Sequence, residues 1–117
     1  MYCIVIRGGA KLENNTQILK GILEGCILSI IFKRETYGYE LLINLKKMGF
    51  NDMVEGTIYP LLLRLEKKEL IISEKRKEES GMTRKYFRLT EGGQKELHNF
   101  KIYWDELSLS VNKILKE

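Results

Sequence analysis

Apolar residues recur every three or four positions in the stretch that begins at Leu19. Positions with this spacing fall on one face of an α-helix, which turns once every ~3.6 residues. The stripe consists of Leu19, Ile22, Leu23, Cys26, Ile27, Ile30 and Ile31. Because only Lys20 and Glu24 add charge to this stretch, we expect its helix to form the centre of the core. Asn14, Asn15 or Thr16 can cap its start.

A second, shorter amphipathic helix is predicted from Tyr37 to Met48. Gly49 follows it directly and can end it, since glycine readily adopts the left-handed conformation that closes many helices. The positions expected to face the core are Leu41, Leu42, Leu45 and Met48.

A third helix is predicted to begin near Thr57. Pro60, the only proline of the chain, would then lie in the first turn, where its missing N–H would have no intrahelical partner. The positions expected to face the core are Leu61, Leu62 and Leu65. The basic side chains expected to point outward are those of Arg64, Lys67 and Lys68.

Two strands, Leu70–Lys75 and Arg84–Leu89, are predicted after this helix, with a glycine-containing loop between them. Residues 74–88 contain six basic and three acidic side chains, so +3 of the chain's net charge of +4 lies on this hairpin. A basic hairpin beside a basic helix is the layout of a winged helix-turn-helix. In that fold the helix enters the DNA major groove and the hairpin, called the wing, flanks it. On charge alone, a solvated hairpin without a partner is an equal alternative.

The last segment predicts a long helix that Thr90 caps and that continues to the C-terminal end. One of its faces carries a heptad seam, in which apolar residues lie alternately three and four positions apart. The seam consists of Leu97, Phe100, Trp104, Leu107, Val111 and Ile114. Such a seam is typical of helices that pair with another helix, so we expect a homodimer. The alternative is that the seam packs back on its own subunit.

Composition limits the remaining classes. With 117 residues, 44% hydrophobic and 31% charged, the chain suits one soluble domain. Its longest uncharged apolar run, residues 25–32, is too short to cross a bilayer, so no membrane partner is expected. Cys3 and Cys26 form no disulfide framework, and His98 is the only histidine, so we expect no metal site. Reduced thiols suit the cytoplasm.

The residue set also lacks the parts of an enzyme. No nucleophile stands in a catalytic context, no glycine-rich loop suits a phosphate, and no ligand pair suits a metal. We therefore expect no catalytic residue and no cofactor.

The start of the third helix offers groups that could contact DNA. Thr57 and Tyr59 could bond phosphates or base edges, and Arg64 could bind a phosphate, all on one exposed edge. Taken singly, Thr57 is better explained as a helix cap and Tyr59 as a packed aromatic. Their joint position favours DNA contact.

Three motifs in one order resemble the PadR family of transcriptional regulators, over a stretch from about Leu19 to the C-terminal end. They are Tyr37-Gly38-Tyr39-Glu40-Leu41, then Glu55-Gly56-Thr57-Ile58-Tyr59-Pro60-Leu61-Leu62 with Arg64-Leu65-Glu66, then Arg84-Lys85-Tyr86-Phe87-Arg88-Leu89-Thr90. The resemblance implies a homodimeric winged-helix repressor, usually of genes for detoxification or efflux. Such a repressor binds a pseudo-palindromic operator on double-stranded DNA and is released by a small aromatic or hydrophobic effector.

The resemblance also bears on individual residues. The expected DNA contacts are Tyr37, Tyr39, Thr57, Tyr59, Arg64, Lys67, Arg84 and Lys85. A single C-terminal helix is similar to the compact branch of the family. In its multidrug-responsive members a tryptophan at the dimer centre stacks on planar drugs, which implies Trp104, with Phe100, as effector-binding residues. The alternative is that Trp104 is a dimer-core aromatic without a ligand.

The expected fold is mainly α with a small β-hairpin, a winged helix-turn-helix followed by a long dimerisation helix. Residues 1–16 would form an N-terminal extension, flexible or an added strand, residues 17–90 the DNA-binding domain, and residues 91–117 the dimerisation helix. The alternative function is a winged-helix module that binds protein rather than an operator.

Overall fold

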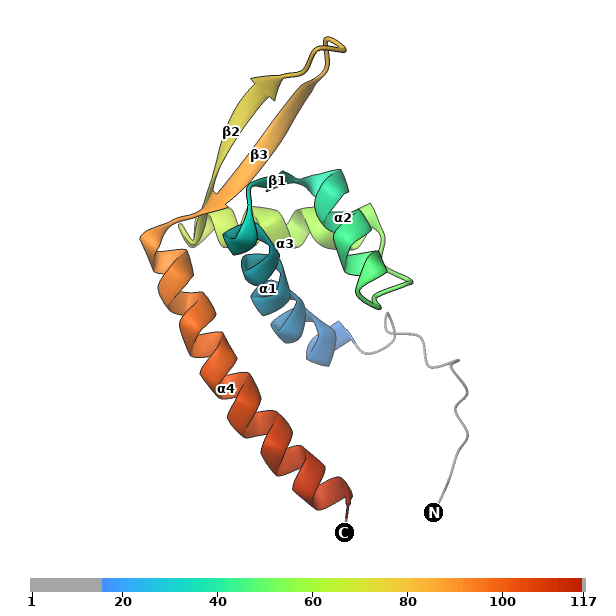
Figure 1. The fold of residues 1–117 in the computed structure, drawn as a ribbon, viewed down its shortest axis with the longest axis vertical. Coiled ribbons are helices and arrows are strands. Elements are labelled where there is room, and N and C mark those ends of the chain that lie inside the picture. Colours follow the sequence, from blue (N-terminus) through green and yellow to red (C-terminus); the bar gives the residue numbers. More distant parts are fainter. Residues whose placement is uncertain (1–15, 117) are drawn as a thin grey trace.

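The computed structural model describes residues 16–116, so the expected N-terminal extension lies outside the described residues apart from Thr16. Four helices and a three-stranded antiparallel sheet make up this part of the chain (Figure 1). In chain order they are α1 (Thr16–Lys33), β1 (Thr36–Tyr37), α2 (Gly38–Lys47), α3 (Glu55–Lys67), β2 (Ile71–Lys77), β3 (Thr83–Leu89) and α4 (Glu91–Leu115). The predicted fold class, mainly α with a wing and a long last helix, is confirmed.

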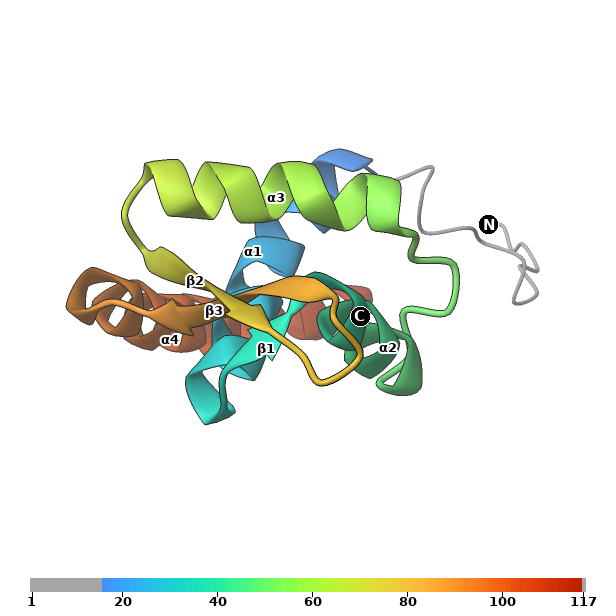
Figure 2. The same cartoon turned by 90° about the horizontal axis from the view of Figure 1, so that it is seen from above.

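The wing and the last helix leave the helical body in opposite directions. The β2–β3 hairpin rises above the body, whereas α4 begins beside the base of β3 and runs downward past α1 (Figure 1). Seen from above, α3 lies along one side of the sheet (Figure 2). Among residues 16–116, no helix combines the length and the apolar composition that crossing a membrane would take.

One apolar core joins the first three helices to the base of the wing. Burial of a large apolar side chain stabilises a fold by roughly 1.5–3 kcal/mol, so this core supplies most of the driving force. Its most completely buried members are Leu23, Ile27, Leu28, Ile31, Leu41, Leu45, Ile58, Leu62, Leu65 and Ile71. Seven of the predicted inward positions of the first three helices are among them. The other predicted inward positions are also buried or partly buried, with the exception of Met48; they are Leu19, Ile22, Cys26, Ile30, Leu42 and Leu61.

The end of α2 differs from its prediction. The helix ends at Lys47, and Met48 is its C-cap, with a side chain 77% exposed. The chain then turns away at Gly49, whose φ of +122° is in the left-handed region that favours glycine. The glycine stop is therefore confirmed, whereas the inward position of Met48 is wrong, because the helix ends before Met48 can face the core.

The start of α3 also differs. The helix begins at Glu55, two residues before the predicted start, so Pro60 is its sixth residue and lies in the second turn. At that position a non-proline residue would donate its N–H to the carbonyl of Gly56. The prediction that the missing N–H has no cost is therefore wrong.

The short strand β1 was not predicted. It pairs with β3 through Thr36 and Phe87 and through Tyr37 and Tyr86, which gives the strand order β1-β3-β2. Two residues are too few for a period of two to be recognised in a sequence. Pairing with β3 makes β1 a strand, and it places Tyr37 beside the wing.

Thr90 begins α4 as predicted. Its hydroxyl accepts a hydrogen bond from the N–H of Gly93 (2.9 Å) and donates one to the carbonyl of Glu69 (2.7 Å). Gly93 is buried so closely against Leu70 that an added Cβ would collide with the Leu70 carbonyl oxygen. At Gly92 an added Cβ would meet only ordinary contacts of 3.6 Å and longer.

These two adjacent glycines give a matched pair of variants. Gly93→Ala should destabilise the protein by at least 1–3 kcal/mol, because backbone has to move to admit the methyl group. Gly92→Ala should be neutral or stabilise by up to about 1 kcal/mol, because alanine favours helix. Thermal unfolding followed by circular dichroism measures both. Equal melting temperatures for the two variants would contradict the close packing of α4 on the wing.

Candidate nucleic-acid interface

A groove of about 460 Å³ lies between α3, the start of α2 and the wing. It is half-open, and both aromatic and charged side chains line it. Its walls are Tyr37, Gly38, Tyr39, Glu55, Tyr59, Leu62, Leu63, Glu66, Met82, Thr83, Arg84, Lys85 and Phe87. All three motifs that suggested the family therefore meet in one place, and five of the eight predicted DNA contacts line the groove.

Contact between Tyr59 and Gly38 explains why two of the motifs belong together. An added Cβ at Gly38 would lie 2.6 Å from Cε1 of Tyr59, so the phenol ring packs directly over the first residue of α2. Tyr59 nevertheless remains 44% exposed. Tyr59 is thus a packed aromatic, as the alternative interpretation predicted, and its exposed part also lines the groove.

Thr57 and Arg64 lie on another side of α3. Residues two apart on a helix point in nearly opposite directions, since each residue turns the helix by about 100°. Nε of Arg64 lies 3.2 Å from a carboxylate oxygen of Glu24 on α1, and Nζ of Lys68 lies 3.6 Å from the other oxygen. The expectation that Thr57, Tyr59 and Arg64 share one edge is therefore wrong.

The row that does face outward beside the groove is Tyr59, Leu63 and Lys67. These residues are spaced four apart, so they lie along one side of the helix. The Leu63 side chain is 59% exposed, and Lys67 is also exposed. Leu63 was missed from the sequence because it is the last of three consecutive leucines, of which only the two that face the core, Leu61 and Leu62, were assigned a direction.

One face of the wing carries a stack of aromatic and cationic side chains. Cζ of Arg84 lies 4.3 Å from the ring centre of Tyr37, and Cζ of Arg76 lies 4.5 Å from that of Tyr86. The two rings meet edge to face, with centroids 5.3 Å apart. Cation–π contacts of this kind stabilise exposed sites by about 0.5–1 kcal/mol. They hold β1 and the wing as one unit.

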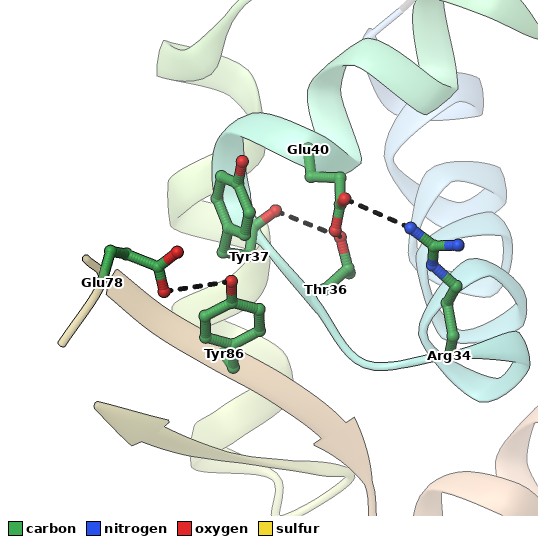
Figure 3. A network of polar contacts seen from close by, with 6 residues as sticks. All are labelled: Arg34, Thr36, Tyr37, Glu40, Glu78 and Tyr86. Carbon is green, nitrogen blue, oxygen red and sulfur yellow. Dashed lines mark hydrogen bonds and ion pairs between the residues drawn. The ribbon is translucent and has the colours of Figure 1, made fainter. Parts of the chain in front are cut away.

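Polar contacts extend this unit at both ends (Figure 3). The Tyr86 hydroxyl donates to a carboxylate oxygen of Glu78 (3.3 Å), and burial, followed by the charge of Glu78, raises the pKa of Tyr86. The buried Thr36 hydroxyl donates to Glu40 (2.7 Å), whose other oxygen accepts from Arg34 (3.4 Å). The wing tip and the first turn of α2 are thereby tied to β1.

Glu66 links α3, which has the place of the groove-entering recognition helix in a winged helix-turn-helix, to the opposite face of the wing. Its carboxylate accepts hydrogen bonds from the Ser73 hydroxyl (2.7 Å) on β2 and from Nζ of Lys85 (3.2 Å) on β3. The Ser73 hydrogen bond, followed by those of Lys85, lowers the pKa of Glu66. Both strands of the wing are thus fixed to one side chain of α3, and Lys85 is partly neutralised before any DNA arrives.

Like charges face each other across the wing. Lys75 is directly opposite Lys85, and Arg76 is directly opposite Arg84. Such cross-strand pairs are unfavourable unless an anion lies between or near them. Within residues 16–116, Lys67, Lys75, Lys77 and Arg88 form no ion pair. These cations are therefore available to a polyanion such as the DNA backbone.

A second, apolar groove of about 620 Å³ separates α1 from α4. Trp104 and Phe100 line it together with Leu97, and Cys26 and Phe50 lie on the opposite side. Burial raises the pKa of the Cys26 thiol. Lys101 is the only charged side chain among the lining residues that the structure describes.

The predicted heptad seam divides into two parts. Leu97 is only 4% exposed and belongs to the core, and the ring of Phe100 packs so closely on α1 that Gly25 has no room for a Cβ. Packing back on the same subunit is thus correct for these two residues. The later members are 40–72% exposed in the single chain, and they are Trp104, Leu107, Val111 and Ile114.

A winged helix with a basic wing beside an aromatic-lined groove is typical of DNA-binding regulators. The sequence pattern of the Transcriptional regulator PadR-like family matches residues 27–99. The crystal structure of a PadR-like transcriptional regulator from Bacillus cereus is similar, with 48% identity, a TM-score of 0.78 and coverage of 86% of this chain and 98% of that one. For a Streptococcus transcriptional regulator the identity is 47%, the TM-score 0.77 and the coverage 84% and 96%.

An uncharacterized protein of Lysinibacillus sphaericus is 33% identical over 103 residues, which cover 86% of this chain and 94% of that one. The chain therefore belongs to the PadR-like family of transcriptional regulators. Members of this family are non-enzymatic DNA-binding proteins, so the chain is a DNA-binding regulator.

Lys75 tests the wing as a phosphate contact. Lys75→Ala should weaken DNA binding severalfold and lower the slope of log affinity against log salt by about one, because one fewer counterion is released. Lys47→Ala, which removes an exposed lysine from the far end of α2, is the matched control and should leave the slope unchanged. Fluorescence anisotropy across a salt series measures both. Equal slopes for the two variants would place the DNA on another face.

Proposed function

We propose that the chain is a homodimeric repressor that binds a pseudo-palindromic operator and is released by a small planar aromatic effector, with detoxification or efflux genes under its control. The observation that carries this proposal is the exposed part of the α4 seam. Trp104, Leu107 and Val111 continue the line of the buried Leu97 and the partly buried Phe100, yet each is at least 40% exposed in the single chain. A second copy of α4 is the natural cover for a heptad seam.

A dimer would also place two wings and two recognition helices on the DNA. One groove offers a few phosphate contacts, whereas two grooves held by one symmetric interface could reach two half-sites about one helical turn apart. A pseudo-palindromic operator follows from that symmetry. The expected DNA contacts Tyr37, Tyr39, Tyr59, Arg84 and Lys85 are supported by their place in the groove.

Three other expected contacts have weaker support. Thr57 and Arg64 lie outside the groove, and Arg64 is held by Glu24. Lys67 is also outside the groove lining, although it continues the row of Tyr59 and Leu63. We propose Lys67 as a phosphate contact, with Arg64 serving mainly to hold α3 against α1.

The apolar groove between α1 and α4 is the proposed effector site. A planar aromatic compound could stack on Trp104 and Phe100, and Lys101 favours a neutral or anionic compound over a cation. α1 lines this groove through Gly25 and Cys26, while its Glu24 holds the recognition helix.

A shift of α1 would therefore reach α3 through Glu24. For the effector to release the protein from DNA, it has to bind one dimer geometry more tightly than the other. The favoured geometry has to be the one that does not bind the operator. A protein-binding winged helix remains the rival function. It would lack the steep fall of DNA affinity with salt that several phosphate contacts impose.

Leu107→Glu tests the dimer. It would place two carboxylates opposite each other in the seam, so the protein should sediment as a folded monomer. Ile102→Glu is the matched control, because Ile102 is similarly exposed at 47% but lies on the other side of α4. A mass of one chain for the unmodified protein would refute the dimer, and so would an unchanged dimer mass for Leu107→Glu.

Trp104 tests the effector site. It is the only tryptophan of the chain, so its fluorescence reports on the apolar groove alone. A panel of neutral, anionic and cationic planar aromatic compounds should contain members that quench it and that release the operator at the same concentrations. Phe100→Ala should weaken both effects together, whereas Ile102→Ala should change neither. If no compound quenches the fluorescence, Trp104 is a structural residue only.

A further inference from the structure

The outward row of the recognition helix lacks the side chains that most often read bases. Between Glu55 and Lys67 there is no asparagine or glutamine, and the only arginine, Arg64, is paired with Glu24. Bidentate hydrogen bonds to guanine or adenine, the strongest direct readout in the major groove, therefore have few donors on this helix.

Apolar groups stand in their place. Leu63 is 59% exposed, Tyr59 44% and Met82, across the groove on the wing side, 58%. Single exposed apolar side chains are common on protein surfaces and require no partner. Here three of them line one groove of a DNA-binding protein, in which the two cations Arg84 and Lys85 are matched by the carboxylates Glu55 and Glu66, so the part of the DNA that enters it is expected to carry apolar groups.

Double-stranded DNA fits this description through one base. Thymine presents an apolar 5-methyl group in the major groove, and it is the only one of the four bases that does. Nothing obstructs close approach at the start of the helix, because an added Cβ at Gly56 would meet no atom within 4 Å. The neighbouring unpaired cations would hold the backbone on either side.

We propose that Leu63 is a specificity-determining residue that contacts thymine methyl groups in the major groove, with Tyr59 beside it. This inference rests on the proposed operator binding and states what the operator contains: at least one thymine in each half-site under the middle of α3. The cations of the wing contribute affinity for the DNA backbone, and Leu63 distinguishes thymine from cytosine.

The test removes single methyl groups from the DNA. A high-affinity site is first selected by the full chain from a random-sequence library, and each thymine is then replaced in turn by deoxyuracil, which lacks only the methyl group. At the contacted positions the affinity should fall about three- to fourfold, the effect of exposing one buried methyl group. Other thymines should show no change.

Protein variants then locate the contact. With Leu63→Ala the same deoxyuracil positions should have no effect, because the methyl group has lost its partner, whereas Leu63→Met should restore part of the sensitivity. Ile72→Ala, which truncates an exposed apolar side chain at the base of the wing outside the groove lining, should keep the full thymine dependence.

The outcomes separate this inference from the proposed function. Sequence-selective binding with no deoxyuracil effect, or with an effect that persists in Leu63→Ala, would overturn the reading by Leu63 and leave the repressor proposal standing. Failure to select any sequence above random DNA would overturn the operator proposal and this inference with it.

Discussion

Burial of α1 is the interaction on which the other features depend. This helix packs against α2, α3, α4 and β3, and its leucine and isoleucine side chains form the centre of the core. Because α1 is surrounded in this way, its remaining surface is shared between two sites. Gly25 and Cys26 line the apolar groove, and Glu24 holds Arg64 and Lys68 of the recognition helix. The apolar groove and the contacts with α3 thus involve neighbouring residues of one helix, so a movement of α1 would reach both.

Charge on the DNA side is divided between structure and binding. Arg64, Arg76 and Lys85 are held by Glu24, Glu35 and Glu66, respectively, in ion pairs that fix helix to helix or wing to body. Exposed pairs contribute only ~0–1 kcal/mol each, so their main effect is on geometry. Of the remaining cations of the wing, Lys75 and Arg84 lie opposite like charges, a disposition that favours an approaching polyanion. The wing is therefore held at a set angle while its outer charges stay available, a combination that suits backbone contacts.

The aromatic residues of the three motifs have a common structural basis. Tyr59 covers Gly38, Tyr37 lies under Arg84, and Tyr86 meets Tyr37 edge to face. These contacts join α2, α3 and the wing at a single corner, so each motif requires the others. Pro60, which is unfavourable inside a helix, lies next to Tyr59 at the same corner, where the recognition helix borders the groove.

Local periodicity was enough to predict the helices, the two long strands, the Thr90 cap and the α4 seam, because each depends on residues close together in the chain. Helix starts were less certain, and an error of two residues at α3 placed Pro60 in the first turn instead of the second. Packing alone made a strand of Thr36 and Tyr37, paired Arg64 with Glu24 and joined Lys85 to Glu66. The partners in these contacts are far apart in the chain, and a periodic pattern carries no information about which distant side chain will stand opposite. The class of protein can therefore be predicted from local spacing. Which cations form ion pairs within the fold, and which stay available to DNA, is decided only when the elements pack.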